Sequence, residues 1–207
     1  MEHSLGRRGF MLILSSPSGA GKTTISKLLI QNDDNITMSI SYTTRSIRAG
    51  EENGKDYYFV TQDQFKEKIA LNYFYEYAEV FGNLYGTPKH FVDQALDSGQ
   101  DVLFDIDWQG TRRLTNMAHE DIVSIFILPP SLAELERRLT NRAKDSSDTI
   151  AKRMERAIDE ISHFNEYDYV IINDSVDSSL QKVLYILKAE RLKRTRQHGL
   201  IDFVSGF

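Results

Sequence analysis

Short apolar runs recur along the chain and alternate with segments in which apolar residues have helical spacing. The runs lie at residues 10–14, 102–104, 123–128 and 169–172, with a weaker alternating run at 36–40. Near-continuous apolar runs of this length are typical of strands in a parallel sheet that is covered on both faces. The pattern therefore predicts a core sheet of five strands.

Six helices are predicted between and after these strands, at residues 22–30, 88–96, 107–117, 133–139, 148–164 and 176–196. Thr87 before Pro88 predicts an N-cap followed by proline at the first helical position, and Gly99 can end that helix. Ser131 and Glu134 have the spacing of a capping box. Because strands and helices alternate, we expect a doubly wound α/β fold with right-handed crossovers.

Two regions depart from this alternation. Residues 41–86 are rich in aromatic side chains, with extended runs at 57–60 and 74–80 and a short helix pattern at 64–70, so we expect an inserted α+β subdomain. Residues 131–149 contain several arginines and a polar loop but no strand pattern, which is typical of a mobile lid. The core then comprises residues 1–40, 87–130 and 150–207 of a single domain.

Composition and charge narrow the class of protein. The 207 residues include no cysteine, which excludes disulfides and thiolate chemistry. No apolar stretch approaches the ~18 residues of a membrane span, and the N-terminus lacks the apolar core of a signal peptide, so we expect a cytoplasmic protein with no membrane partner. With 25 basic and 30 acidic residues the net charge is −5. We therefore expect no nucleic-acid partner, and any anionic ligand must be bound by a local basic cluster.

A glycine-rich loop joins the first predicted strand to the first predicted helix. Its sequence is Ser16-Pro17-Ser18-Gly19-Ala20-Gly21-Lys22-Thr23-Thr24. In a P-loop, backbone N–H groups converge on phosphate oxygens, the lysine reaches the terminal phosphates and the next hydroxyl binds Mg²⁺. The glycines, Lys22 and Thr23 match this motif, while Ser16 replaces its first glycine. A plain glycine-rich turn is the alternative, but the strand–helix junction favours a nucleoside triphosphate site.

The residues that follow suggest a second phosphate site. The Asn-Lys-x-Asp motif of GTPases and the loop set of protein kinases are both absent from the sequence. Arg45 and Arg48 instead lie three residues apart among hydroxyl side chains. Because guanidinium groups bind phosphate oxygens in pairs, these arginines form a plausible phosphate clamp. Taken alone, they fit a solvated basic turn equally well.

Further motifs occur in order from about residue 9 to residue 195. They are Thr43-Thr44-Arg45, Arg48-Ala49-Gly50-Glu51, Asn53-Gly54-Lys55-Asp56-Tyr57, Gly82-Asn83-x-Tyr85-Gly86, Asp105-Ile106-Asp107-x-Gln109-Gly110 and Tyr167-Asp168-Tyr169 before Asn173-Asp174. Together with the P-loop they resemble guanylate kinases of the bacterial type, in which a residue other than glycine at position 16 is normal. The resemblance implies a P-loop nucleoside monophosphate kinase that transfers the γ-phosphoryl group of ATP to GMP, and to dGMP, with Mg²⁺ as cofactor. Residues 41–86 would then be the GMP-binding subdomain.

The resemblance also implies roles for individual residues. ATP would be bound by Ser16, Pro17, Ser18, Gly19, Ala20, Gly21, Lys22, Thr23, Thr24 and Asn173. The phosphate of GMP would be bound by Ser41, Arg45, Arg48, Tyr57 and Tyr85, and its base by Glu76, Thr87 and Asp107. Carboxylates can accept hydrogen bonds from guanine N1–H and the 2-amino group, and a hydroxyl can donate to O6. Lys22, Arg138, Arg142 and Arg153 would be catalytic, while Thr23 would bind Mg²⁺ directly and Asp105 through water.

Other interpretations stay open for several residues. Thr87 and Asp107 also suit N-caps, and Asn173 also suits a turn. Arg137 is expected to form an ordinary surface ion pair, and Trp108 to pack rather than stack. The C-terminal basic cluster is expected to be mostly a solvated helix end, and comprises Lys188, Arg191, Lys193, Arg194 and Arg196.

Two other functions fit parts of the sequence. An inactive guanylate-kinase-like interaction module would share the fold, but such modules usually have degraded P-loops, whereas Lys22 and Thr23 are present here. A kinase for another nucleoside monophosphate would share the P-loop, but Glu76 with Thr87 favours guanine. The oligomeric state stays open between a monomer and a homodimer.

Overall fold

Five parallel strands form the core sheet, in the order β2-β7-β1-β8-β9. The computed structural model describes residues 6–80, 82–142 and 147–207, with side chains described outside positions 80, 141–142 and 147–149. The strands are β1 (Met11–Ser15), β2 (Ile36–Met38), β7 (Asp101–Asp105), β8 (Ile122–Leu128) and β9 (Tyr169–Ile172). Each predicted apolar run forms one of them, which confirms the five-stranded α/β core.

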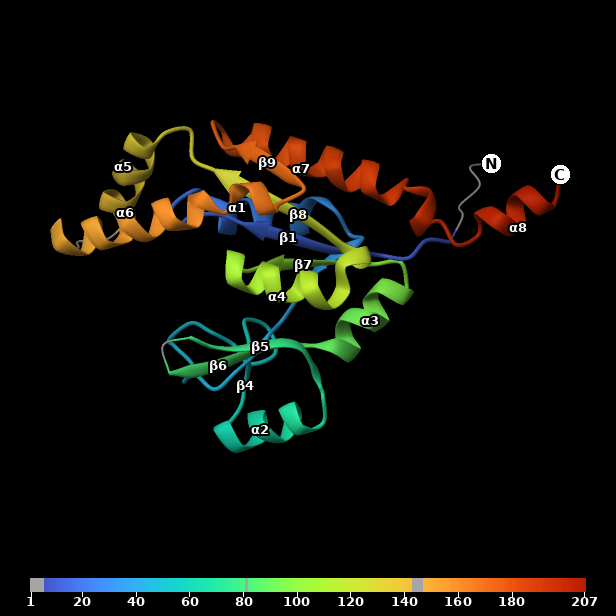
Figure 1. The fold of residues 1–207 in the computed structure, drawn as a ribbon, viewed down its shortest axis with the longest axis horizontal. Coiled ribbons are helices and arrows are strands. Elements are labelled where there is room, and N and C mark those ends of the chain that lie inside the picture. Colours follow the sequence, from blue (N-terminus) through green and yellow to red (C-terminus); the bar gives the residue numbers. More distant parts are fainter. Residues whose placement is uncertain (1–5, 81, 143–146) are drawn as a thin grey trace.

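Helices cover both faces of this sheet (Figure 1). The helices α1 (Lys22–Asn32) and α7 (Val176–Arg191) lie on one face, and α3 (Lys89–Asp97) and α4 (Trp108–Ala118) on the other. Along β1, Leu12 and Leu14 face the first pair of helices, while Met11 and Ile13 face the second. All of β1 is buried, because its side chains alternate between two faces of the sheet and helices cover both faces.

A second sheet, with one helix, forms a separate unit beside the core (Figure 1). Its strand order is β4-β3-β6-β5, and it consists of β3 (Tyr42–Thr43), β4 (Tyr58–Phe59), β5 (Phe74–Val80) and β6 (Asn83–Pro88), with α2 (Gln62–Ala70). We call these elements the small-sheet unit. The rings of Phe65 and Phe74 stack at 4.6 Å, and a Cβ on Gly86 would lie 2.9 Å from both. Strand β6 was not predicted because its glycine and proline disfavour a strand, and here the glycine is required by packing.

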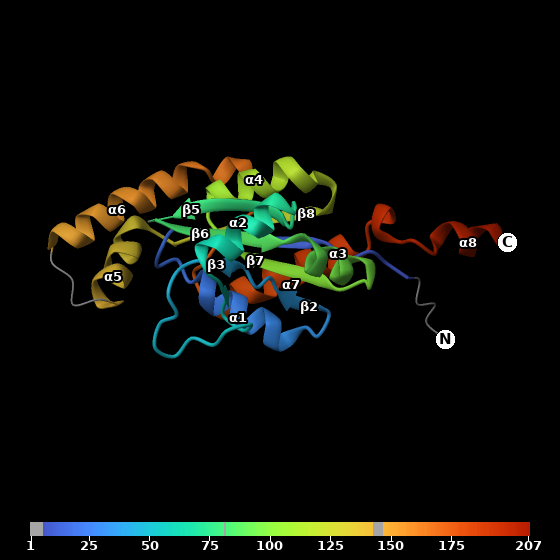
Figure 2. The ribbon, with the colours of Figure 1, turned by 90° about the horizontal axis from the view of Figure 1, so that it is seen from below.

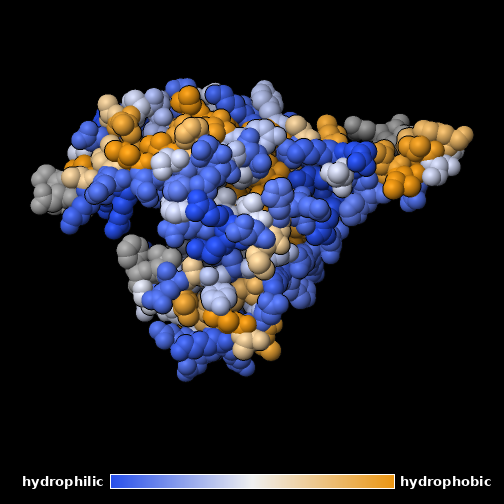
Figure 3. Space-filling model, viewed as in Figure 1, coloured by the Kyte–Doolittle hydropathy of each residue, from blue (hydrophilic) through white to orange (hydrophobic). Residues whose placement is uncertain are grey.

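The expected lid, residues 131–149, contains α5 (Leu132–Arg142) and the start of α6 (Ser147–Ser162). Ser131 caps α5 as predicted, since its hydroxyl accepts a hydrogen bond from the Glu134 amide at 3.1 Å. Figure 2 shows both helices extending from one end of the molecule, and Figure 3 shows a hollow between them and the small-sheet unit. Residues 143–146 of the expected lid lie outside the described residues. Trp108 packs against a protein side chain, as expected, with its ring stacked on that of His163 at 3.7 Å between the centroids.

Two predicted helix ends are wrong. The helix α3 begins at Lys89 with Pro88 as its N-cap residue, and within the described part of the chain no side chain caps it, so Thr87 is not the cap. The helix predicted over 176–196 ends at Arg191. After Arg191 the chain forms two short helical segments, η3 (Arg194–Arg196) and α8 (Leu200–Ser205). Two other short helical segments occur earlier in the chain, η1 (His119–Asp121) and η2 (Phe164–Glu166). No helix in the described ranges is long and apolar enough to cross a membrane.

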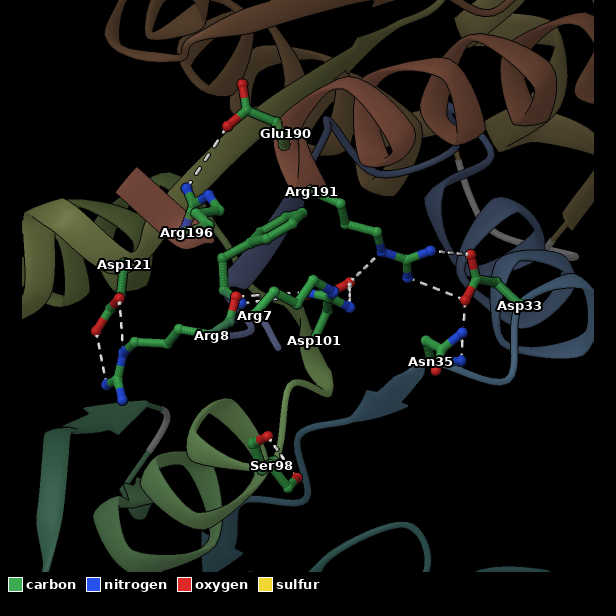
Figure 4. Close-up of polar contacts among 12 residues, drawn as sticks. Arg7, Arg8, Asp33, Asn35, Ser98, Asp101, Asp121, Glu190, Arg191 and Arg196 are labelled. Carbon is green, nitrogen blue, oxygen red and sulfur yellow. Dashed lines mark hydrogen bonds and ion pairs between the residues drawn. The ribbon is translucent and has the colours of Figure 1, made fainter. Parts of the chain in front are cut away.

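The C-terminal basic cluster is exposed at Lys188, Lys193 and Arg194, as expected, but Arg191 and Arg196 are enclosed by other residues (Figure 4). Arg191 donates to both carboxylate oxygens of Asp33, at 2.6 and 2.9 Å, and to Asp101 at 2.7 Å. Arg196 is only 6% exposed and lies over the ring of Phe10, 4.5 Å from its centroid. The expectation fails for Arg191 because Asp33 and Asp101, which are distant in the sequence, form ion pairs with it, and for Arg196 because it packs on Phe10 and pairs with Glu190.

Candidate functional site

The glycine-rich loop lies at the carboxyl end of β1, at the central strand of the sheet. Gly19 and Gly21 have φ values of +90° and +101°, a backbone conformation that glycine adopts without strain. The loop lines a cavity of about 310 Å³ together with Lys22, Thr23 and Asp105. Open α/β sheets bind ligands at this edge, so the sequence-predicted triphosphate site has the geometry of a P-loop.

Lys22 is held by the end of the neighbouring strand. Its Nζ lies 2.6 Å from Asp105 Oδ1 and donates to the Ile106 carbonyl at 3.2 Å. Asp105 also lines a second cavity, which it shares with Thr23. The carboxylate therefore orients the lysine and stands between the two cavities.

Glu160 is a site residue that the sequence analysis missed. It extends from α6 into the P-loop cavity, where its Oε2 accepts a hydrogen bond from the Ser18 amide at 3.1 Å. Burial raises the pKa of Glu160, although the Ser18 amide and Lys22 act in the opposite direction. One signal was available: Glu160 lies seven residues after Arg153, which places both on the same face of a helix.

Asn173 braces the back of the P-loop rather than forming a turn in solvent. It is 1% exposed, donates through Nδ2 to the Ala20 carbonyl at 2.7 Å and accepts at Oδ1 from Ser179. A Cβ on Gly21 would lie 2.5 Å from this amide nitrogen. Asn173 also lines a cavity of about 420 Å³ beside the loop. Thr24 lies in the first turn of α1, where its amide donates to the Gly21 carbonyl.

Two lid arginines line that same cavity. Arg137 and Arg138 both donate to Glu134, at 2.7 to 2.8 Å, and together they lower the pKa of Glu134 to about 2. The surface ion pair expected for Arg137 is confirmed, but the residue also faces the cavity. Arg153 lies on α6. Arg142 ends α5, and its side chain lies outside the described residues.

A cavity of about 420 Å³ opens between the core sheet and the small-sheet unit. Ser41, Tyr57, Thr23, Asp105 and Glu51 are among the residues that line it. Thr23 and Asp105 therefore line both this cavity and the P-loop cavity.

Glu51 holds the arginines beside this cavity. Arg45 donates to both of its oxygens, at 3.0 and 2.7 Å, and the Arg48 amide donates to it at 2.8 Å. The guanidinium of Arg45 also lies over the ring of Tyr57, 5.4 Å from its centroid, and the Tyr57 and Tyr85 rings meet edge to face. Burial raises the pKa of Tyr57, so its hydroxyl stays a donor at neutral pH. The structure therefore brings Arg45, Tyr57 and Tyr85 together, with Arg48 exposed at the margin.

Two of the three predicted base-recognition residues are in contact. The Thr87 hydroxyl donates to Glu76 Oε1 at 3.0 Å. The Asp107 carboxylate caps α4 by accepting from the Gly110 amide at 2.8 Å, and its charge raises the pKa of Glu76. The N-cap interpretation of Asp107 is thus confirmed, and its side chain also lines the P-loop cavity. Burial raises the pKa of Glu76, whereas the Thr87 hydroxyl and the nearby Arg113 lower it.

These features define a class of protein. A parallel α/β sheet carries a P-loop at its carboxyl edge, and a second cavity with hydroxyl and guanidinium groups adjoins the loop. This is the arrangement of a P-loop kinase with separate sites for a phosphoryl donor and an acceptor.

Comparison with known proteins identifies the family. The family model described as "Guanylate kinase" matches residues 8–190. A guanylate kinase of Novosphingobium aromaticivorans is 58% identical over 205 residues, covering 99% of this chain and 93% of the relative, and one of Paramagnetospirillum magneticum is 56% identical, covering 98% and 94%. The crystal structure of guanylate kinase from Anaplasma phagocytophilum superposes with a TM-score of 0.78 at 40% identity, covering 97% and 96% of the two chains. The chain belongs to the guanylate kinase family.

Proposed function

We propose that this chain catalyses the guanylate kinase reaction in the two adjoining cavities, with the residues assigned below. The reaction is the ATP-dependent phosphorylation of GMP to GDP, the activity of the family to which the chain belongs. The observation that carries the proposal is the intact P-loop with Lys22 held by Asp105 at the boundary between the cavities.

ATP binds with its phosphates on the P-loop, along residues 16–24. The backbone N–H groups and the start of α1 stabilise the phosphate charge, and Lys22 contacts the terminal phosphates. The adenosine lies toward the cavity lined by Asn173, which supports the loop from behind.

GMP binds in the second cavity. Its phosphate is held by Ser41, Arg45, Arg48, Tyr57 and Tyr85, since two guanidiniums and three hydroxyls suit a dianion. Its base extends toward Glu76 and Thr87. The Glu76 carboxylate accepts from N1–H and the 2-amino group, and Asp107 completes the guanine contacts. These groups contact base and phosphate, so dGMP is a substrate as well.

Transfer needs no general base, because the attacking oxygen belongs to an ionised phosphate. Catalysis then depends on alignment and on neutralising the charge of the transferring group. Lys22 supplies one cation, and Arg138, Arg142 and Arg153 supply others when the lid closes. The hollow between the lid helices and the small-sheet unit supports such a closing movement, which would exclude water as a competing acceptor.

The residues between the cavities fit Mg²⁺. Thr23 and Asp105 offer hydroxyl and carboxylate oxygens on the boundary of both cavities, the kind of ligand that this cation prefers. No group of three acidic or histidine side chains in the described residues forms a metal site by itself. Such a donor set suits an ion that is carried by the nucleotide phosphates and contributes neutralisation of their charge.

Cellular properties follow from this assignment. A role in purine nucleotide metabolism requires access to ATP and GMP, and this requirement supports a cytoplasmic location. A monomer or a homodimer would serve the reaction equally well, because both cavities are formed by one chain. Sedimentation analysis of the purified protein distinguishes the two.

A coupled ADP-release assay tests the function. ATP is supplied with GMP, dGMP, AMP, CMP or dTMP in turn, and we expect turnover with GMP and dGMP. Absence of GMP-dependent turnover would refute the proposed reaction, and a preference for AMP would refute the assignment of Glu76. A Lys22→Ala variant should lose nearly all turnover while keeping its thermal stability.

A further inference from the structure

Arg113 links the core to the proposed guanine pocket. It lies on α4, whereas Glu76 lies on β5 of the small-sheet unit, and these two elements pack against each other. Its Nε is 3.4 Å from Glu76 Oε2, on the carboxylate oxygen opposite the one that Thr87 contacts. Each oxygen of the buried carboxylate thus has a donor, one from each unit of the molecule.

The carboxylate needs such a partner because it is poorly hydrated. The Glu76 side chain is only 12% exposed, and burial favours its protonated form. The groups that face it are the Thr87 hydroxyl from β6, the Arg113 guanidinium from α4 and the charge of Asp107 at the start of α4. The first two favour the ionised form of Glu76, and Asp107 opposes it. An ionised carboxylate is required to accept two hydrogen bonds from guanine.

We propose that Arg113 is a positioning residue for guanine recognition, which keeps Glu76 ionised and holds β5 against α4 so that both carboxylate oxygens face the base. This inference rests on the proposed function and adds a residue that does not touch either substrate. Its effect is confined to GMP, because Arg113 lies outside the residues that line the P-loop cavity.

The neighbouring Arg112 provides a matched control. It lies on the same helix, is ion-paired to Glu166 at 2.6 Å, and is 53% exposed at its side chain. Replacing either arginine by glutamine removes one positive charge from the same part of α4. Arg112→Gln removes a charge from a surface ion pair, whereas Arg113→Gln removes a charge from the proposed guanine pocket.

The test measures kcat and KM for GMP from pH ~5.5 to ~8.5 in the wild type, Arg113→Gln, Arg112→Gln and Arg113→Lys. As pH falls, Glu76 becomes protonated and kcat/KM for GMP falls. Loss of Arg113 moves this fall to higher pH, since the ionised form loses its cation. We expect KM for GMP in Arg113→Gln to rise about three- to tenfold at the acid end, and less at the alkaline end. KM for ATP and the kcat at saturating GMP should change little.

Two results support the assignment specifically. Arg113→Lys should restore most of the wild-type pH profile, and Arg113→Gln should have no further effect on KM for GMP in a Glu76→Gln background. An unchanged pH profile in Arg113→Gln would overturn the inference, as would equal changes in KM for ATP and GMP or an equal shift in Arg112→Gln. Thermal unfolding of each variant shows whether it is folded. Failure of the proposed function is distinct, because the wild type itself would then lack turnover with GMP.

Discussion

Replacing Asp101 by asparagine should destabilise the protein without impairing its chemistry. The Asp101 side chain is fully buried at the start of β7. It accepts from Arg7 at 2.6 and 3.1 Å, from the Phe10 amide at 3.2 Å and from Arg191 at 2.7 Å (Figure 4). The substitution keeps the shape of the side chain but removes the negative charge that faces two arginines.

The size of the effect follows from the burial of the partners. Breaking a fully buried ion pair typically costs about 3–5 kcal/mol. Here Arg7 and Arg191 keep 17% and 16% exposure, and Arg191 retains Asp33, so we expect about 2–3 kcal/mol in the free energy of unfolding. For a chain of this length each kcal/mol lowers Tm by about 2–4 °C, which gives a fall of about 4–12 °C.

Thermal and urea unfolding at neutral pH measure this effect, with Asp97→Asn as control. Asp97 pairs with Arg8 but is 68% exposed, so its loss should cost less than about 1 kcal/mol. The kcat/KM for GMP at 25 °C should be unchanged in Asp101→Asn, because the residue lies at the opposite end of β7 from Asp105. A fall in Tm no larger than that of Asp97→Asn would refute the reasoning, and so would a large loss of activity in folded protein.

Two further predictions concern the P-loop. Gly21→Ala should raise KM for ATP at least about tenfold, because the new Cβ would lie 2.5 Å from Asn173 Nδ2 at a φ of +101°; Gly50→Ala, strained at φ +88° but with no neighbour within 4 Å, should leave it unchanged. Glu160→Gln should tighten ATP binding about three- to tenfold in calorimetry, since it removes a carboxylate charge from the Ser18 amide. The same change at exposed Glu155 on α6 should have no effect, and weaker binding in Glu160→Gln would show that the charge supports the loop instead.

The core of the fold could be predicted because local pattern and tertiary environment agree there. Every residue of β1 is buried on a sheet covered on both sides, and a continuous apolar run specifies that state. The short strands β3 and β6 could not be found in the same way. Gly86 and Pro88 disfavour a strand locally, and β6 forms because Phe65 and Phe74 need a surface without a side chain beside them.

The candidate site likewise contains residues that a local pattern predicts and residues that only tertiary contacts bring together. The P-loop was recognisable because its glycines, lysine and hydroxyl are contiguous. The contact of Glu160 with Ser18 joins residues 142 positions apart, and that of Arg113 with Glu76 joins residues 37 apart. No local pattern encodes such pairs. Thr87 shows the converse, since its local sequence suits a helix cap but its hydroxyl is used by a carboxylate on the adjacent strand.

Carboxylates contact several of the groups that would meet phosphate. Asp105 contacts Lys22, Glu51 contacts Arg45, and Glu134 contacts Arg138. The Ser18 amide of the P-loop likewise donates to Glu160. A net charge of −5 is therefore compatible with binding two nucleotides, because Lys22, Arg45 and Arg138 each have an acidic partner that holds them in place. When phosphate binds, it replaces the carboxylate partner of a cation or shares the cation with it. Affinity therefore depends on the geometry of several contacts more than on total charge. This favours ligands that fill both cavities at once, which is the condition for transfer between them.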